Sequence, residues 1–275
     1  MASMSADEVR SVQIQTLREV VSLCERSGIR YQLTYGTLLG AARHAGFIPW
    51  DDDIDVMMPR SDYTRFLTEA ATHLPQFQIG RPGDAWPFGF AKIWDRRTQV
   101  VEDANMSFTS GVGIDIWPVD DVASSGWRRT FAFSTSRALQ ALETLRSVRA
   151  RHDHSLPKRL VLVVSQFALN RLPISAIGTL RDRLARSAVN GSGDLGILVG
   201  SYPWAVDAAL MATGSGLPFE EEGSLAVPSG WDYVLTTMYG DYMQLPPADK
   251  QVTHHAYTAY WIPAESSAPR HEGQA

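Results

Sequence analysis

The spacing of apolar residues along the first quarter of the chain predicts alternating helices and strands. Residues 7–26 carry apolar side chains at an imperfect helical spacing, and residues 29–34 alternate between apolar and polar as a half-buried strand does. The same two patterns then repeat, with a short helix predicted for residues 36–43, a strand for 54–58 and a helix for 61–72. This order indicates an α/β sheet domain.

Further strands and a group of helices are predicted beyond residue 72. Short alternating segments bounded by turn residues predict strands at residues 77–79, 88–94, 99–101 and 112–117. Helical periodicity returns at residues 131–151, 157–170 and 174–188. We therefore expect an α/β (α+β) fold in which a mixed sheet is flanked by helices and carries an added helical region.

The composition describes a mildly acidic globular protein. The chain has 275 residues, 44% of them hydrophobic, and a formal net charge of −5, which argues against a general nucleic-acid binder but leaves binding through a local patch open. Its one cysteine excludes a disulfide framework and a cysteine-based zinc site. The first residues lack the basic and apolar regions of a signal peptide, so we expect a cytoplasmic protein.

Charge is distributed unevenly. Residues 127–190 contain eleven arginines and one lysine against one glutamate and two aspartates, which gives this segment a charge of +9 and leaves −14 for the rest. Solvated helix faces would explain the excess. A surface for an anionic acceptor or for lipid headgroups at the inner face of a membrane would explain it equally well. The apolar run at residues 160–169 is too short to span a bilayer and fits either a buried helix or an interfacial one.

Three aspartates at alternate positions are the candidate chemical centre. In an extended chain Asp51, Asp53 and Asp55 place their carboxylates on one face. Such carboxylates repel one another unless a cation compensates, and Mg²⁺ prefers oxygen ligands. We therefore predict that Asp53 and Asp55 bind Mg²⁺, with Mn²⁺ as the alternative. A solvated acidic turn is the competing interpretation.

A calcium-binding loop is a second interpretation of the same run. Asp51, Asp53, Asp55 and Asp62 occupy its positions 1, 3, 5 and 12, but Val56 stands where the loop requires glycine. The calcium loop is therefore rejected.

Two other segments add to the candidate site. Asp115 lies between Ile114 and Ile116 in a predicted strand, where it would complete a metal site or act as general base, unless it is a surface residue of an edge strand. Gly36 and Thr37 open a helix whose N–H groups suit phosphate oxygens, although helix capping alone also explains the pair.

The segment of residues 35–55, which ends in Trp50-Asp51-Asp52-Asp53-Ile54-Asp55, closely resembles the signature of the LicD family. That family includes bacterial phosphocholine transferases, is related to fukutin-related protein, a ribitol-phosphate transferase, and has a nucleotidyltransferase-like core. The resemblance continues at residues 90–98, 114–121 and 239–247, and at His254-His255.

The resemblance implies transfer of a phosphorylated alcohol from a CDP-linked donor to a hydroxyl of a glycan or another acceptor, with release of CMP. By matching positions, Gly36 and Thr37 would contact donor phosphate. One or two Mg²⁺ ions would be held by Asp53, Asp55 and Asp115. Lys92 would pair with the donor phosphates, unless it is an ordinary surface lysine.

The matching segments contain further candidates. Arg43 would contact phosphate or acceptor, or only stabilise a helix C-terminus. Tyr239 and Asp241 would shape the nucleoside end of the pocket, although packing explains such residues too. For His254 and His255 we favour structural hydrogen bonds over metal ligation.

These expectations divide the chain into four parts. They are a catalytic core at 1–125, a basic helical insert at 126–190, a part that completes the cleft at 191–262 and a flexible tail at 263–275. Two alternatives to the phospho-alcohol transferase remain open. A true nucleotidyltransferase would use the same carboxylates, and a catalytically inactive binding protein would keep only the fold.

Overall fold

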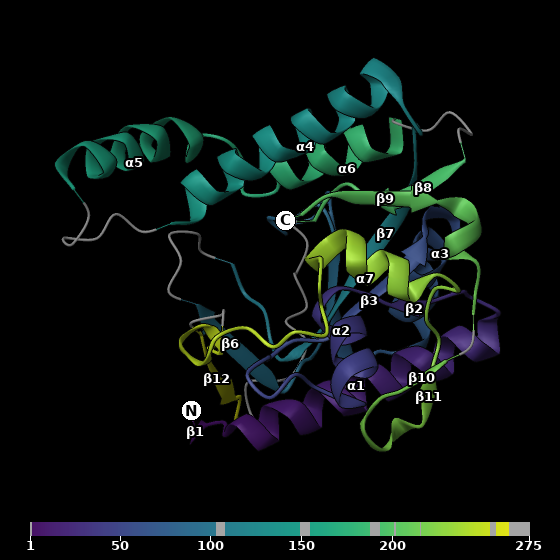
Figure 1. Ribbon diagram of the computed structural model, residues 1–275. Coiled ribbons are helices and arrows are strands. Elements are labelled where there is room, and N and C mark those ends of the chain that lie inside the picture. The colour runs from purple at the N-terminus through teal and green to yellow at the C-terminus, as the bar shows by residue number, and fades with distance from the viewer. Residues whose placement is uncertain are drawn as a thin grey trace.

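A computed structural model describes residues 2–102, 108–148, 155–187, 193–200, 202–214, 216–253 and 257–263 (Figure 1). The predicted tail beyond Pro263 and the histidine pair His254-His255 lie outside these residues. The described part is a mixed α/β fold, as the sequence predicts.

The central sheet has seven strands. Five are ordered β2-β3-β7-β5-β4, and β8 and β9 continue the sheet from the far end of β7. The strands are β2 (Gln32–Leu33), β3 (Asp55–Pro59), β4 (Phe77–Gly80), β5 (Ala91–Asp95), β7 (Gly113–Val122), β8 (Asp194–Ile197) and β9 (Trp204–Asp207). Strands β3 and β7 are parallel and the other described pairs are antiparallel. The sheet is therefore organised around β7, which pairs with three neighbours.

Two helices cover the sheet: α1 (Ala6–Ser27) contacts β7 and β5, and α3 (Arg60–His73) contacts β3 and β7. Helix α1 begins at a capping box in which Ser5 and Glu8 satisfy each other's backbone N–H groups. It ends at Gly28, whose φ of 59° is the left-handed conformation that glycine adopts without strain. The local sequence thus fixes both ends of this helix.

The predicted helical region forms three helices: α4 (Gly126–Ser147), α5 (Leu156–Leu169) and α6 (Ala176–Ser187). Figure 1 shows α4 and α6 side by side above the sheet and α5 set apart beyond the end of α4. Helix α4 starts five residues before its predicted start. The prediction missed these residues because large apolar side chains there, Trp127 and Phe131, are exposed and do not mark a buried helix face. The buried-helix interpretation of residues 160–169 is wrong for most of α5, which is largely exposed.

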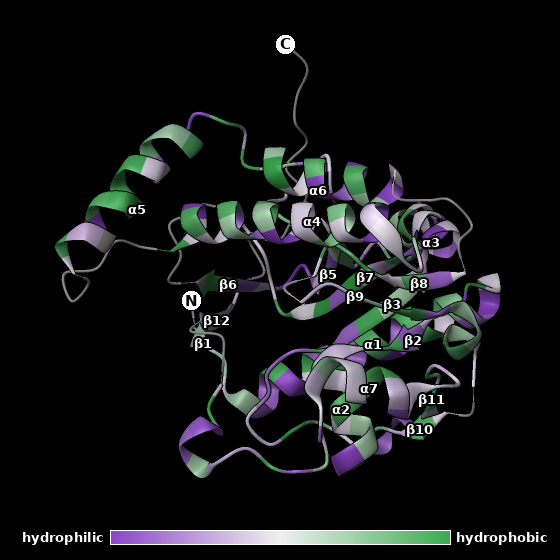
Figure 2. Cartoon of the chain, turned by 45° about the horizontal axis from the view of Figure 1, so that its top comes forward, coloured by the Kyte–Doolittle hydropathy of each residue, from purple (hydrophilic) through white to green (hydrophobic). Residues whose placement is uncertain are grey.

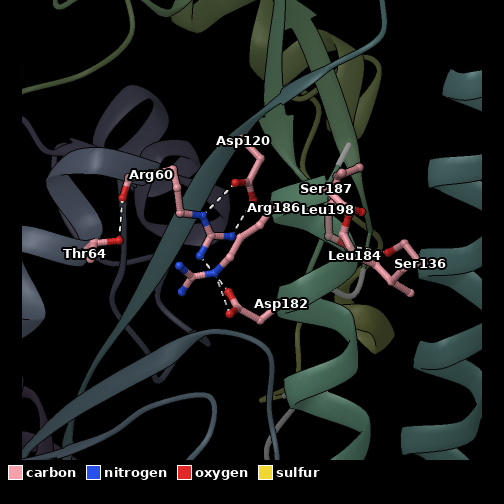
Figure 3. Close-up of polar contacts among 9 residues, drawn as sticks. All are labelled: Arg60, Thr64, Asp120, Ser136, Asp182, Leu184, Arg186, Ser187 and Leu198. Atoms are coloured by element: carbon pink, nitrogen blue, oxygen red, sulfur yellow. Dashed lines mark hydrogen bonds and ion pairs between the residues drawn. The ribbon is translucent and has the colours of Figure 1, made fainter. Parts of the chain in front are cut away.

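Buried ion pairs attach the helical region to the sheet. Arg60 at the start of α3 donates to both carboxylate oxygens of Asp120 on β7 and to Asp182 on α6, all at 2.6 Å (Figure 3). Asp182 also accepts a hydrogen bond from Arg186 at 2.8 Å. Asp120 is 1% exposed, so the guanidinium neutralises charges that have lost their water. The helical region is therefore fixed against the core rather than loosely tethered.

The C-terminal part completes the structure. The remaining elements are β1 (Ala2–Ser3), α2 (Tyr35–His44), β6 (Thr98–Glu102), η1 (Ala208–Met211), β10 (Leu217–Pro218), η2 (Glu220–Glu222), β11 (Ser224–Leu225), α7 (Trp231–Tyr239), η3 (Ala248–Lys250) and β12 (Tyr257–Trp261). Strand β12 pairs with the N-terminal β1 and with β6 in a second sheet, β10 and β11 form a small hairpin after η1, and α7 packs on α2. No helix among the described residues has the length and apolar character needed to cross a membrane.

Candidate active site

Three chemically important side chains meet on adjacent strands. Asp55 of β3 and Asp115 of β7 are partner residues in the parallel pairing, and Lys92 of β5 is the partner of Asp115 on its other side. Partner residues in a sheet project from the same face. The Lys92 ammonium donates to Asp115 Oδ1 at 2.9 Å. The sequence predicts each of these residues separately, and the fold brings them together.

Asp55 is held in a dry and strongly polar environment. It is 5% exposed, and its Oδ1 accepts a hydrogen bond of 2.7 Å from Trp117 Nε1. Burial, and then the charges of Asp53 and Asp115, raise the pKa of the Asp55 carboxyl well above its ordinary value. A divalent cation would relieve this cost, because it would compensate all three carboxylates.

The acidic run reaches this site from a turn. Strand β3 begins at Asp55, close to its predicted start at residue 54, and Asp51 and Asp53 lie before it rather than in a continuous extended segment. The cause is a turn after Ile48, whose carbonyl accepts from the Asp51 N–H at 2.9 Å. Carboxylate oxygens of Asp51, Asp52 and Asp53 lie within 4.8 Å of one another. Asp52 therefore joins the oxygen ligands that a metal ion would find here.

The start of α2 supports the acidic residues. The buried Thr37 hydroxyl accepts a hydrogen bond of 2.7 Å from the Asp55 N–H. A Cβ atom on Gly36 would lie 2.4 Å from Asp51 Oδ2, so the absence of a side chain lets that carboxylate approach the helix end. Both residues thus have a structural role, and contact with donor phosphate stays a prediction. The residue before them, Tyr35, has a φ of 45° and lines the cleft.

A cleft of about 530 Å³ opens beside the carboxylates, and Asp52, Asp53, Asp55, Lys92 and Asp115 line it. One wall is aromatic. Phe90 stacks on Trp117 at 3.9 Å between ring centroids, and Phe88 stacks on Phe90 at 5.2 Å. The wall is completed by Trp86. The sequence did not predict this wall, because three of its rings come from the loop before β5 and the fourth, Trp117, comes from β7.

The helical region supplies further lining side chains, which the sequence did not predict. Lining side chains from α4 and α6 include Gln140, Glu143, Thr144 and Arg181. Buried Arg181 donates to the Glu143 carboxylate and, at 2.9 Å, to the Gly200 carbonyl. Burial raises the pKa of Glu143 to about 7, although Arg181 opposes the shift. The one signal in the sequence was that Glu143 is a rare acid in a basic segment.

The C-terminal part contributes as well. Tyr202 and Tyr257 line the cleft. Tyr239 is 43% exposed, yet burial of its hydroxyl end, and then the charges of Asp55, Asp51 and Asp53, raise the pKa of its phenol. Tyr239 is nevertheless not among the residues that line the cleft.

Two further candidates lie elsewhere. Arg43 donates to the Tyr242 carbonyl at 2.8 Å and to His44 at 3.0 Å, which joins α2 to the C-terminal segment. Asp241 is exposed and is not among the residues that line the cleft. The calcium-loop alternative is excluded by the fold, since Asp62 lies in α3 and pairs with Arg30 at 2.6 Å.

Comparison with known proteins shows which class of protein carries this mixed sheet and acidic cleft. The sequence model described as "LicD/FKTN/FKRP, nucleotidyltransferase domain" matches residues 28–157. The lipopolysaccharide cholinephosphotransferase LicD of Haemophilus influenzae is 30% identical over 94% of this chain and 99% of that protein. The chain is therefore a phosphotransferase. It belongs to the LicD family.

A second relative is similar over a shorter segment. The ribitol 5-phosphate transferase FKRP of Homo sapiens is 55% identical over 42 residues, or 15% of this chain and 8% of that protein, and FKRP of Mus musculus matches to the same extent. Both kinds of relative transfer a phosphorylated alcohol, as their names state. The family model covers every predicted metal ligand and Lys92, whereas Arg181 and Tyr202 lie beyond it.

Proposed function

We propose that this protein transfers a phospho-alcohol from a CDP-linked donor to a hydroxyl of a glycan or a related acceptor and releases CMP. The observation that carries the proposal is the register of β3 and β7, which places Asp55 beside Asp115 at a cleft large enough for a nucleotide. The names of the relatives support the type of group transferred.

The carboxylates fit a divalent ion. Asp53, Asp55 and Asp115 would hold one or two Mg²⁺ ions, or Mn²⁺, with Asp52 within reach of the same cluster. When bound, the metal would neutralise the donor diphosphate and the charge that develops on CMP. Buried Asp55 fits this role in particular, because burial and then the charges of Asp53 and Asp115 raise its pKa, and a bound cation would favour its ionised form.

The other cleft residues would bind and orient the substrates. Lys92 already lies 2.9 Å from Asp115 and would offer its ammonium group to donor phosphate. Asp115 would serve either as metal ligand or as general base for the acceptor hydroxyl. The aromatic wall favours a cationic alcohol, since aromatic side chains attract quaternary ammonium groups. Choline is therefore the first alcohol to test, and ribitol the second.

We further propose that the protein works in the cytoplasm, where a CDP-linked donor is available. Association with the inner face of a membrane through the basic helical region belongs to the same proposal. No role in nucleic-acid binding is proposed, because the net charge of −5 would repel a polyanion over most of the surface.

The test is a screen of CDP-choline, CDP-ribitol and CTP with candidate acceptors in the presence and absence of Mg²⁺. We expect Mg²⁺-dependent release of CMP and an acceptor mass gain equal to the phospho-alcohol. A mass gain equal to a nucleotide would instead establish a true nucleotidyltransferase. Turnover that is unaffected by removal of divalent ions with a chelator would contradict the metal site.

A further inference from the structure

Helix α5 exposes an unusually apolar face. Leu160 is 65% exposed and Phe167 is 68% exposed, whereas Leu162 on the other side is 4% exposed. At 100° per residue, the exposed large apolar residues fall mostly within one broad arc of the helix. They are Leu156, Leu160, Val161, Val163, Val164 and Phe167. Figure 2 shows this helix apart from the body of the protein, with hydrophobic residues over much of its length.

The buried side of α5 attaches it to α4. Gln166 is 8% exposed, and its amide donates to the carbonyls of Leu145, at 3.1 Å, and Val148. These contacts, together with Leu162, fix the orientation of the helix and direct its apolar arc away from α4. The exposed arc is therefore a consequence of how the helix packs.

The charges around this helix have one sign. In the described part of the helical region, the two carboxylates, Glu143 and Asp182, are both buried. Every exposed charged side chain described there is an arginine: Arg128, Arg137, Arg159, Arg171, Arg183 and Arg186. Just beyond the C-terminal end of α5, the Arg171 guanidinium lies 3.8 Å from the centre of the Phe167 ring. The apolar face is thus bordered by positive charge.

We propose that α5 is a membrane-docking helix that lies in the headgroup region of a bilayer with anionic lipids. Its 14 residues span about 21 Å, which is too short to cross a hydrocarbon core of about 30 Å. An apolar face bordered by arginine is the pattern of helices that lie in the membrane interface. A second copy of this chain fits poorly, because like arginine-rich surfaces would repel each other.

Docking through α5 would place the membrane near the cleft. Helix α5 follows α4 in the chain, and the second half of α4 contributes Gln140, Thr144 and Ser147 to the cleft wall. This step rests on the proposed function: an acceptor carried on a lipid would reach the cleft along the membrane surface. The docking itself depends only on the surface of α5.

The experiment is flotation of the full chain with vesicles of phosphatidylcholine alone and of phosphatidylcholine mixed with phosphatidylglycerol. We expect binding to the anionic vesicles that weakens with added salt. The variant Leu160→Glu with Phe167→Glu should bind at least about ten-fold more weakly, since charge replaces apolar area in the interface. The matched control is Tyr233→Glu with Val252→Glu, at residues that are 58% exposed on α7 and 53% exposed after η3, and it should bind like the wild type.

Three outcomes would overturn the proposal. The first is a wild-type protein that does not float with the anionic vesicles, and the second is an α5 variant that floats like the wild type. The third is a wild type that is oligomeric in solution while the α5 variant is monomeric, which would assign the apolar face to contact with a second copy. Unchanged melting temperatures would show that the variants are folded. Release of CMP from a soluble donor without vesicles should be equal in wild type and α5 variant. Vesicle binding without any donor turnover would contradict the proposed function and leave the docking helix standing.

Discussion

Asp55 and Asp115 come from strands 60 positions apart in the chain, yet they are direct partners in the parallel pairing of β3 and β7. In both cases the residues directly before and after the aspartate are buried and apolar. The pairing therefore places two carboxylates side by side, and Lys92 next to Asp115 adds one positive charge. A site with this balance of charges favours a bound cation.

Replacement of either partner by its amide should abolish turnover without unfolding the protein. In Asp55→Asn the side-chain oxygen can still accept the hydrogen bond from Trp117, but the charge that would hold a metal is lost. We expect kcat/KM for CMP release to fall by about 10³-fold or more in Asp55→Asn, Asp115→Asn and Asp53→Asn. The control is Asp241→Asn, whose exposed side chain lies outside the cleft lining. Near-normal rates in the first two variants would refute the assignment.

Stabilisation by Mg²⁺ should depend on pH. The pKa of Asp55 is raised by burial and by its acidic neighbours. Its protonated form therefore stabilises the metal-free fold at low pH, and this contribution is lost as the pH rises through the folded pKa. A metal needs the ionised form, so the gain in Tm with Mg²⁺ should be larger at about pH 8 than at about pH 5.5.

Differential scanning fluorimetry at both pH values measures this difference. Asp55→Asn should remove most of the difference, because the residue that exchanges a proton for the metal is then absent. An equal gain at both pH values in the wild type would show that Asp55 is already ionised without metal.

The sequence predicts the core of this fold well, because the core depends on local patterns. Alternation around Asp115 and the strand after the acidic run predict the two strands that carry Asp115 and Asp55, and helical periodicity predicts α4, α5 and α6. The pairing of β3 with β7 is a long-range contact that no local pattern encodes. The family resemblance supplied the link between them.

The part of the cleft lining that comes from α4 and α6 could not be predicted in this way. Glu143 and Arg181 are 38 positions apart on two helices, and they meet where α4 packs on α6. For Thr37 the sequence context suggested contact with phosphate, but in the structure its hydroxyl accepts a hydrogen bond from the backbone N–H of Asp55. Side-chain partners of this kind depend on packing between distant segments.

Lys92 should contribute to donor binding. Its ammonium group faces the cleft beside Asp115, and Lys92→Met would remove the positive charge that we assign to donor phosphate. We expect the KM for the CDP-linked donor to rise by about ten-fold or more, with a smaller rise in Lys92→Arg, which keeps the charge in another geometry. Steady-state kinetics over a range of donor concentrations measures the effect. The exposed Lys250→Met is the control, and an unchanged KM in Lys92→Met would remove this residue from the site.

Arg60 should be important for stability rather than for chemistry. Arg60→Met would leave Asp120 and Asp182 buried without their main partner, which costs about 3–5 kcal/mol when one member of a buried ion pair is removed. Urea denaturation monitored by circular dichroism measures the loss. The exposed Arg183→Met should change the free energy of unfolding by less than about 0.5 kcal/mol. Equal effects of the two substitutions would show that the network in Figure 3 contributes little.

Two glycines of α2 should respond differently to the same substitution. A Cβ on Gly36 would meet the Asp51 carboxylate at 2.4 Å, whereas a Cβ on Gly40 would meet the Gly46 carbonyl at 2.3 Å. A carboxylate can rotate away, but the backbone cannot move without disturbing the end of the helix. Gly40→Ala should therefore lower the stability by about 1–3 kcal/mol with or without Mg²⁺.

Gly36→Ala should keep most of its metal-free stability and instead lose part of the rise in Tm that Mg²⁺ gives, because Asp51 is displaced from the acidic cluster. Thermal melts of both variants with and without Mg²⁺ separate the two effects. If Gly36→Ala responds to Mg²⁺ like the wild type, then the approach of Asp51 to the start of α2 has no part in metal binding.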